Sequence, residues 1–198
     1  SDGELESAAA AVTIVVNAVE NLMASAEPEL SPEDLPILSD EELEAIEAEA
    51  IRRWTQALDL DDSAQAMLGA VTFQIVDFSD RTLGRALKDA ILIDADGAGY
   101  GWYVDAAPAD DLEFGLRLSE WELTALESSP AFGRMDLLTV VMHELGHILG
   151  YEDLDPEDHS LMSASLDAGA RRLVDDETTP AAPADDYRSL VSMERAAD

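Results

Sequence analysis

The sequence predicts an α+β fold, because two strongly helical segments enclose a region with the patterning of strands and turns. Apolar side chains recur at helical spacing through residues 40–58, and Ser39 with Glu42 forms a capping box ahead of them. Residues 135–149 form a second predicted helix with one broad apolar side, and Gly150 follows it as a helix stop. The resulting order of helix, strands, acidic loop, long helix and irregular tail is typical of an α+β domain.

The region between the predicted helices contains the expected strands. Apolar and polar residues alternate through 71–75, as in a half-buried strand, and residues 90–93 form a short apolar run. A turn rich in aspartate and glycine follows at 94–99. Residues 101–104 are expected to form an edge-like strand, and residues 119–127 a short helix.

Length and composition predict one folded domain with flanking segments of a different character. The chain has 198 residues, of which 47% are hydrophobic, and this is enough for one core of substantial size. Residues 39–174 are expected to form the domain, residues 1–38 a linker or pro-segment, and residues 175–198 a linker and tail. Within the domain, residues 151–174 are expected to be irregular apart from one tight turn. Because the first residue is not methionine, we expect the sequence to be part of a larger chain.

The charge of the chain is its most unusual bulk property. Eleven basic residues oppose 44 acidic ones, which gives a formal net charge of −33. Such a surface repels nucleic acid and anionic membranes, so neither is an expected partner. No apolar run approaches the roughly 18 residues of a membrane span, so membrane insertion is not expected either. The acidic surface suits a high-salt or calcium-rich medium, and it is equally consistent with an acidic protein that has no special partner. The absence of cysteine excludes disulfides and thiolate metal ligands.

One short segment of the second predicted helix carries the residues of a metal site. His143 and His147 are four residues apart, so both imidazoles lie on one helix face and can bind one ion. Glu144 is rotated by about 100° from His143, which suits a carboxylate that accepts a proton from water rather than one that binds the metal. The chain has only three histidines, so a chance match to this pattern is rare. The H-E-x-x-H arrangement therefore predicts a zinc site with Glu144 as general base.

A catalytic zinc site needs a third protein ligand, and two residues are candidates. Asp153 lies six residues after His147, and Gly150 between them lets the chain leave the helix and turn back. His159 lies six residues further on and offers a third imidazole. Both residues are therefore open as the third ligand at this point, Asp153 as the nearer one and His159 as the alternative.

The run from His143 to Asp153 resembles the H-E-x-x-H-x-x-G-x-x-H/D motif of the metzincin clan of zinc peptidases. Met162, in the run Ser-Leu-Met-Ser-Ala, is similar to the methionine of the clan's Met-turn, which underlies the zinc without binding it. Aspartate as third ligand resembles the snapalysin-type variant, whereas matrixins, astacins and adamalysins usually have histidine there. Residues 40–173 are similar in layout to matrixin-like domains of large secreted bacterial proteins.

This resemblance implies a zincin/metzincin-like fold, in which a twisted mixed sheet packs on an N-terminal helix and an active-site helix, with a small irregular C-terminal subdomain. It also implies a secreted or cell-surface endopeptidase that acts on peptide or protein substrates, with zinc as cofactor and Glu144 as general base. A peptide is expected to add along a strand edge such as 101–104. Unlike matrixins, the chain has no histidine before His143, so a second, structural zinc site is not expected.

An acidic region between the strands and the second helix offers the oxygen ligands that calcium prefers. The candidates are Asp94, Asp96, Asp105, Asp110, Asp111 and Glu113. A solvated acidic loop accounts for the same residues equally well.

A second functional class stays open beside the enzyme. The domain can also be a non-catalytic module of a large secreted or surface adhesion protein, stabilised by zinc or calcium. The presence of Glu144 favours the enzyme, because a purely structural zinc site has no use for that carboxylate.

Overall fold

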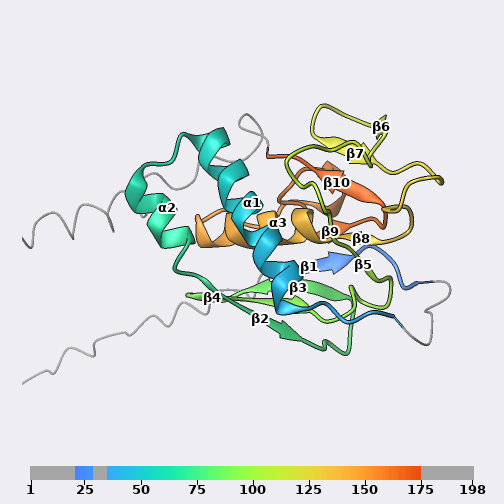
Figure 1. Ribbon diagram of the computed structural model, residues 1–198, viewed down its shortest axis with the longest axis horizontal. Helices are drawn as coiled ribbons and strands as arrows, with labels where there is room; N and C mark the ends of the chain where they lie inside the picture. The colour runs from blue at the N-terminus through green and yellow to red at the C-terminus, as the bar shows by residue number, and fades with distance from the viewer. Residues whose placement is uncertain (1–20, 29–34, 175–198) are drawn as a thin grey trace, which may run out of the picture.

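The computed structural model describes residues 21–28 and 35–174 (Figure 1). The expectations for residues 1–20 and 175–198 lie outside this part of the chain. The helices in the described ranges are α1 (Asp40–Leu58), α2 (Asp62–Leu68) and α3 (Leu137–Ile148), with a 3-10 turn at Pro156–Asp158. The strands are β1 (Asn21–Ala24), β2 (Thr72–Val76), β3 (Thr82–Ala86), β4 (Ala90–Asp94), β5 (Trp102–Tyr103), β6 (Leu116–Arg117), β7 (Glu122–Thr124), β8 (Met135–Asp136), β9 (Ser165–Leu166) and β10 (Ala170–Arg172). No helix among these residues is long and apolar enough to cross a membrane.

The largest sheet has five strands in the order β2-β4-β3-β1-β9. β2 and β4 are parallel, as are β1 and β9, whereas β3 runs antiparallel to both of its neighbours. β10, β7 and β6 form a three-stranded sheet, and β5 pairs with β8 in a third, two-stranded sheet. The α+β class and the mixed sheet are therefore confirmed.

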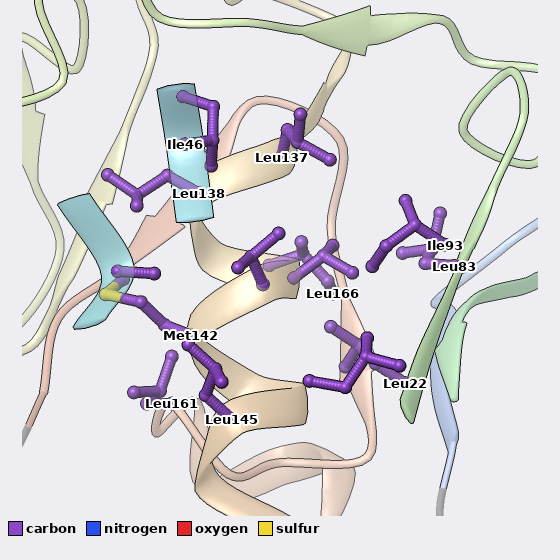
Figure 2. Packing of buried hydrophobic residues seen from close by; sticks show 14 of the residues in the cluster. Leu22, Ile46, Leu83, Ile93, Leu137, Leu138, Met142, Leu145, Leu161 and Leu166 are labelled. Carbon is purple, nitrogen blue, oxygen red and sulfur yellow. The ribbon is translucent and has the colours of Figure 1, made fainter. Parts of the chain in front are cut away.

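Helix α3 packs on this sheet, and α1 packs on α3 (Figure 1). The apolar side of α3 meets β3, β4 and β1, while α1 packs across α3. The Trp54 indole N–H of α1 donates to the Met142 carbonyl of α3 over 2.8 Å. Figure 2 shows side chains from both helices and from the sheet that meet in one core; those labelled are Leu22, Ile46, Leu83, Ile93, Leu137, Leu138, Met142, Leu145, Leu161 and Leu166.

Both predicted helices form, but the second begins at Leu137, because residues 135–136 form strand β8. The Ser39 side chain accepts from the Glu42 backbone, and the Glu42 carboxylate accepts from the Ser39 N–H in return. α3 ends within a residue of the expected position, and Gly150 beyond it has φ of 92°, a conformation that favours glycine.

A buried ion network fixes the start of α3. The Asp136 carboxylate caps α3 by accepting from the Thr139 N–H over 3.2 Å, and it also accepts two bonds of 2.8 and 2.9 Å from Arg171. The same guanidinium donates to Asp105 over 2.8 Å and to Asp111 over 3.1 Å. The β10 strand and the loop before β6 are thereby tied to the helix that carries the two histidines.

Several elements differ from the expectations. Residues 21–24 form a strand inside the main sheet, so this part of the 1–38 segment belongs to the folded domain and is not a linker. Within 119–127 the structure has strand β7 and no helix, because Leu123 is buried and β7 pairs with β10 on one side and β6 on the other. The tail expected to be irregular contains β9 and β10, whose partners are distant in sequence.

Candidate metal centre

α3 places His143 and His147 one turn apart in the interior of the domain. Both side chains are almost completely buried, and their Nε2 atoms lie 3.0 Å apart. Their ring planes are nearly perpendicular, at 85°. The two imidazoles therefore present the same ring nitrogen to one point, as the four-residue spacing predicts.

Backbone carbonyls orient both imidazole rings. Nδ1 of His143 lies 2.8 Å from the Leu161 carbonyl oxygen, and Nδ1 of His147 lies 2.8 Å from that of Tyr151. A carbonyl can only accept, so both Nδ1 atoms carry a proton, and the Nε2 atoms are the ones turned to the common point. Two lone pairs at 3.0 Å repel each other unless a cation or a proton lies between them. This arrangement fits the outer hydrogen bonds of metal-binding histidines.

Asp153, the third ligand that the resemblance implies, completes the group. Its Oδ1 lies 3.2 Å from Nε2 of His143 and 3.4 Å from Nε2 of His147. Ligand atoms about 2.0–2.1 Å from a tetrahedral zinc lie about 3.3–3.4 Å from one another, so the three distances fit a single ion. Oδ1 is buried and lies within ion-pair distance of both Nε2 atoms, so the three atoms meet at one point. In the described part of the chain, these three side chains are the one group of its kind suited to hold a metal ion.

The turn at Met162 lies directly against α3. Met162 is buried, and a Cβ added to Gly146 would come within 2.5 Å of its sulfur, so this glycine makes room for the methionine between the two histidines. The Leu154 N–H donates to the Met162 carbonyl over 2.8 Å. The turn therefore packs against α3 at Gly146, and it also holds the loop that carries Asp153.

Glu144 points from α3 toward the sheet. Its side chain is 0% exposed, and its Oε1 accepts from the Leu22 backbone N–H over 3.3 Å. Gly84 of β3, the strand partner of Leu22, also lies against this carboxylate, and a Cβ added to it would be only 2.6 Å from Oε1. Burial raises the pKa of Glu144 to about 8. This carboxylate can therefore hold or release a proton near neutral pH.

The three candidate ligands already stabilise positive charge at their common point. Burial lowers the pKa of His143. Burial would lower the pKa of His147 too, but the carboxylates of Asp153 and Glu144 outweigh it and raise this pKa to about 9. Burial opposes ionisation of Asp153, yet the two imidazoles beside it hold the pKa of this carboxyl below its usual range. A metal ion that binds here has to displace the proton on His147.

His159, the alternative third ligand, does not join this group. Its side chain is 49% exposed, and its Nδ1 lies 3.1 Å from a carboxylate oxygen of Glu122. The structure thus brings Asp153 and not His159 to the pair of histidines.

The six proposed calcium ligands do not come together as a site. Asp94 is buried and accepts from the backbone N–H groups of Phe78, Asp96 and Ala98. Asp105 and Asp111 are bound to Arg171. No three of the six form a group suited to a metal ion, and local hydrogen bonds and ion pairs account for most of them.

Two residues at the site were not expected from the sequence. The strand beside Glu144 is β3, whereas residues 102–103 of the proposed peptide-binding edge are buried and paired with β8. Gly84 contacts the carboxylate, and Leu22 donates to it. A glycine inside a strand does indicate a close approach, so Gly84 carried a usable signal, but Leu22 carried none.

Comparison with protein families, curated proteins and solved structures gives no match for this chain.

Proposed function

We propose that this protein is a zinc-dependent endopeptidase of the metzincin type. The observation that carries the proposal is the convergence of two Nε2 atoms and one carboxylate oxygen, 3.0–3.4 Å apart, next to a buried glutamate on the same helix. The turn at Met162, which packs against α3 between the two histidines, and the mixed sheet that contacts α3 also fit this class. The metzincin assignment itself rests on the sequence motif.

Each residue has a distinct task in the proposed reaction. His143, His147 and Asp153 would hold the zinc, which supplies a Lewis acid for the peptide carbonyl and lowers the pKa of water. Glu144 accepts the proton of the attacking water and returns it to the leaving amine. Its raised pKa makes the ionised carboxylate a stronger base for the first step, and a group with a pKa of about 8 still gives up a bound proton near neutral pH in the second.

One observation favours the alternative, a non-catalytic module stabilised by zinc. Glu144 is fully buried, so an external substrate has no access to it in this conformation. The two functions differ in what zinc removal does: the enzyme loses peptide cleavage, whereas the module loses stability and never cleaves.

Removal of the metal tests the proposed function. Dialysis of the full chain against a zinc chelator is expected to reduce cleavage of an unstructured protein such as casein to background. Addition of Zn²⁺ should restore the cleavage, and Ca²⁺ alone should not. Cleavage by protein shown to be metal-free would rule the proposal out.

Gly84→Ala is expected to slow cleavage by about 10²-fold with zinc still bound. The added methyl group would lie 2.6 Å from Oε1 of Glu144 and 2.9 Å from its Cδ, so the carboxylate has to move. Displacement of a catalytic group by about 1 Å costs a rate factor of this size. The rate and the zinc content of the purified variant measure the effect.

Gly115→Ala is the matched control, because its new methyl group meets only the flexible end of Leu126 at 3.2 Å. Equal rates for the two variants would mean that the position of Glu144 does not matter for cleavage.

A further inference from the structure

β1 fills a slot between two other strands of the main sheet. Its backbone N–H groups point alternately to the two sides: Ala24 donates to the Arg81 carbonyl beside β3, while Met23 and Ser25 donate to the Ala164 and Leu166 carbonyls of the β9 side. β1 runs antiparallel to β3 and parallel to β9. A short extended segment is thus bound on both edges through its backbone, as peptides are bound by strand addition.

At Leu22, beside the proposed general base, the acceptor of the backbone N–H is a side chain. The Leu22 N–H faces the β3 side, where Gly84 is its partner in the register, yet it donates to Oε1 of Glu144. Gly84 has no side chain, so the carboxylate reaches the strand at this point. The Asn21–Leu22 peptide bond therefore lies against the proposed general base, with its nitrogen as the hydrogen-bond donor.

The side chains of β1 alternate between buried and partly exposed positions. Leu22 and Ala24 are fully buried, whereas Asn21 and Met23 are partly exposed. Figure 2 shows Leu22 pointing into the core on the side of α3. The slot therefore accepts a large aliphatic side chain directly after the bond that faces Glu144, and a small one two positions further on.

The site is closed to other peptides while β1 is in place. Glu144 is 0% exposed, and the carbonyls of Arg81, Ala164 and Leu166 are all engaged by β1. Departure of β1 would leave strand edges on β3 and β9 with unpaired backbone groups facing each other. Such a gap fits an extended peptide of the same direction and spacing.

We infer that residues Asn21–Ala24 occupy the substrate-binding slot as an internal, substrate-like strand, and that an external peptide binds in the same place after this strand leaves. The inference rests on the proposed function, because the slot binds substrate only if the protein is a peptidase. The preferred external substrate is an extended peptide with a large aliphatic residue in the place of Leu22 and a small residue in the place of Ala24. The intact chain therefore cleaves slowly, at a rate limited by how often β1 leaves the slot.

Two variants of the full chain displace β1 by different means. Leu22→Asp places a charge in a fully buried apolar position, and Met23→Pro removes the N–H that donates to Ala164. Ala26→Asp is the matched control, because it adds the same charge to the same segment at an exposed position. Circular dichroism and zinc content establish that each variant is folded and loaded.

The probe is a fluorescent peptide with the sequence of residues 19–26, and it is added to zinc-loaded proteins that also carry Glu144→Gln. We expect the peptide to bind the Leu22→Asp and Met23→Pro proteins at least tenfold more tightly than the parent or the Ala26→Asp protein. The same peptide with Leu22 replaced by aspartate should not bind. With Glu144 intact, the two displacing variants should cleave casein at least tenfold faster than the parent.

Folded, zinc-loaded variants that bind no more peptide than the parent would overturn the inference and make β1 a permanent strand. Zinc-dependent casein cleavage in the same proteins would leave the proposed function standing. Tight peptide binding without cleavage in any variant would support the peptide-binding slot. The same result would contradict the proposed peptidase function.

Discussion

Glu144→Gln is expected to reduce peptide cleavage by about 10²–10⁴-fold, the usual contribution of a general base, while the protein keeps its zinc. Glutamine has the same shape, and its amide oxygen can still accept from the Leu22 N–H and lie against Gly84. It cannot take a proton from water. We expect metal binding to persist, because the candidate ligand atoms belong to His143, His147 and Asp153.

The rate is best compared in two backgrounds, the parent chain and the Leu22→Asp variant, since β1 covers Glu144 in the parent. Zinc content and the midpoint of thermal unfolding serve as controls and should not fall. Cleavage within a factor of about three of the parent rate in both backgrounds is incompatible with the role assigned to Glu144.

Arg171→Leu is expected to lower the free energy of unfolding by about 3–5 kcal/mol, the cost of removing one partner from a buried ion pair. The guanidinium is fully buried, makes two bonds with Asp136 and one each with Asp105 and Asp111, and lies 4.2 Å from the centre of the Phe114 ring. Burial lowers its pKa, but these carboxylates raise it well above the usual value, so the charge is firmly held. Leucine would fill part of the space and leave the buried Asp136 carboxyl group without its cationic partner.

Urea denaturation followed by fluorescence measures this loss. Arg134→Leu, on an exposed side chain near the same helix, is the control and should change the free energy by no more than about 0.5 kcal/mol. Similar effects of the two substitutions would show that the Arg171 network does not hold α3 in place.

The elements predicted correctly from the sequence are those whose signal is local. α1 carries its own capping box and apolar stripe, and β2 and β4 carry their own alternation or apolar run. β1, β7, β9 and β10 have two to four residues each, and their formation depends on partners far along the chain. The local sequence around β7 favours a helix, and only its pairing with β10 and β6 decides for a strand.

The candidate site also has some features that the local sequence predicts and others that depend on residues far along the chain. His143, Glu144 and His147 lie on one helix, so their spacing alone places them together. The contact of Glu144 with Leu22 joins residues 122 positions apart, and no local pattern could have revealed it. The choice between Asp153 and His159 also needed coordinates, because both follow the helix at a distance that a loop can span.

The zinc content of the purified full chain tests the central claim most directly. We expect the parent chain and His159→Ala to bind a single zinc ion with similar affinity. Asp153→Ala should weaken zinc binding by more than about 100-fold, beyond the usual cost of losing a hydrogen bond that supports a ligand. Loss of zinc in His159→Ala with retention in Asp153→Ala, or no zinc in the parent chain, would contradict the metal centre described above.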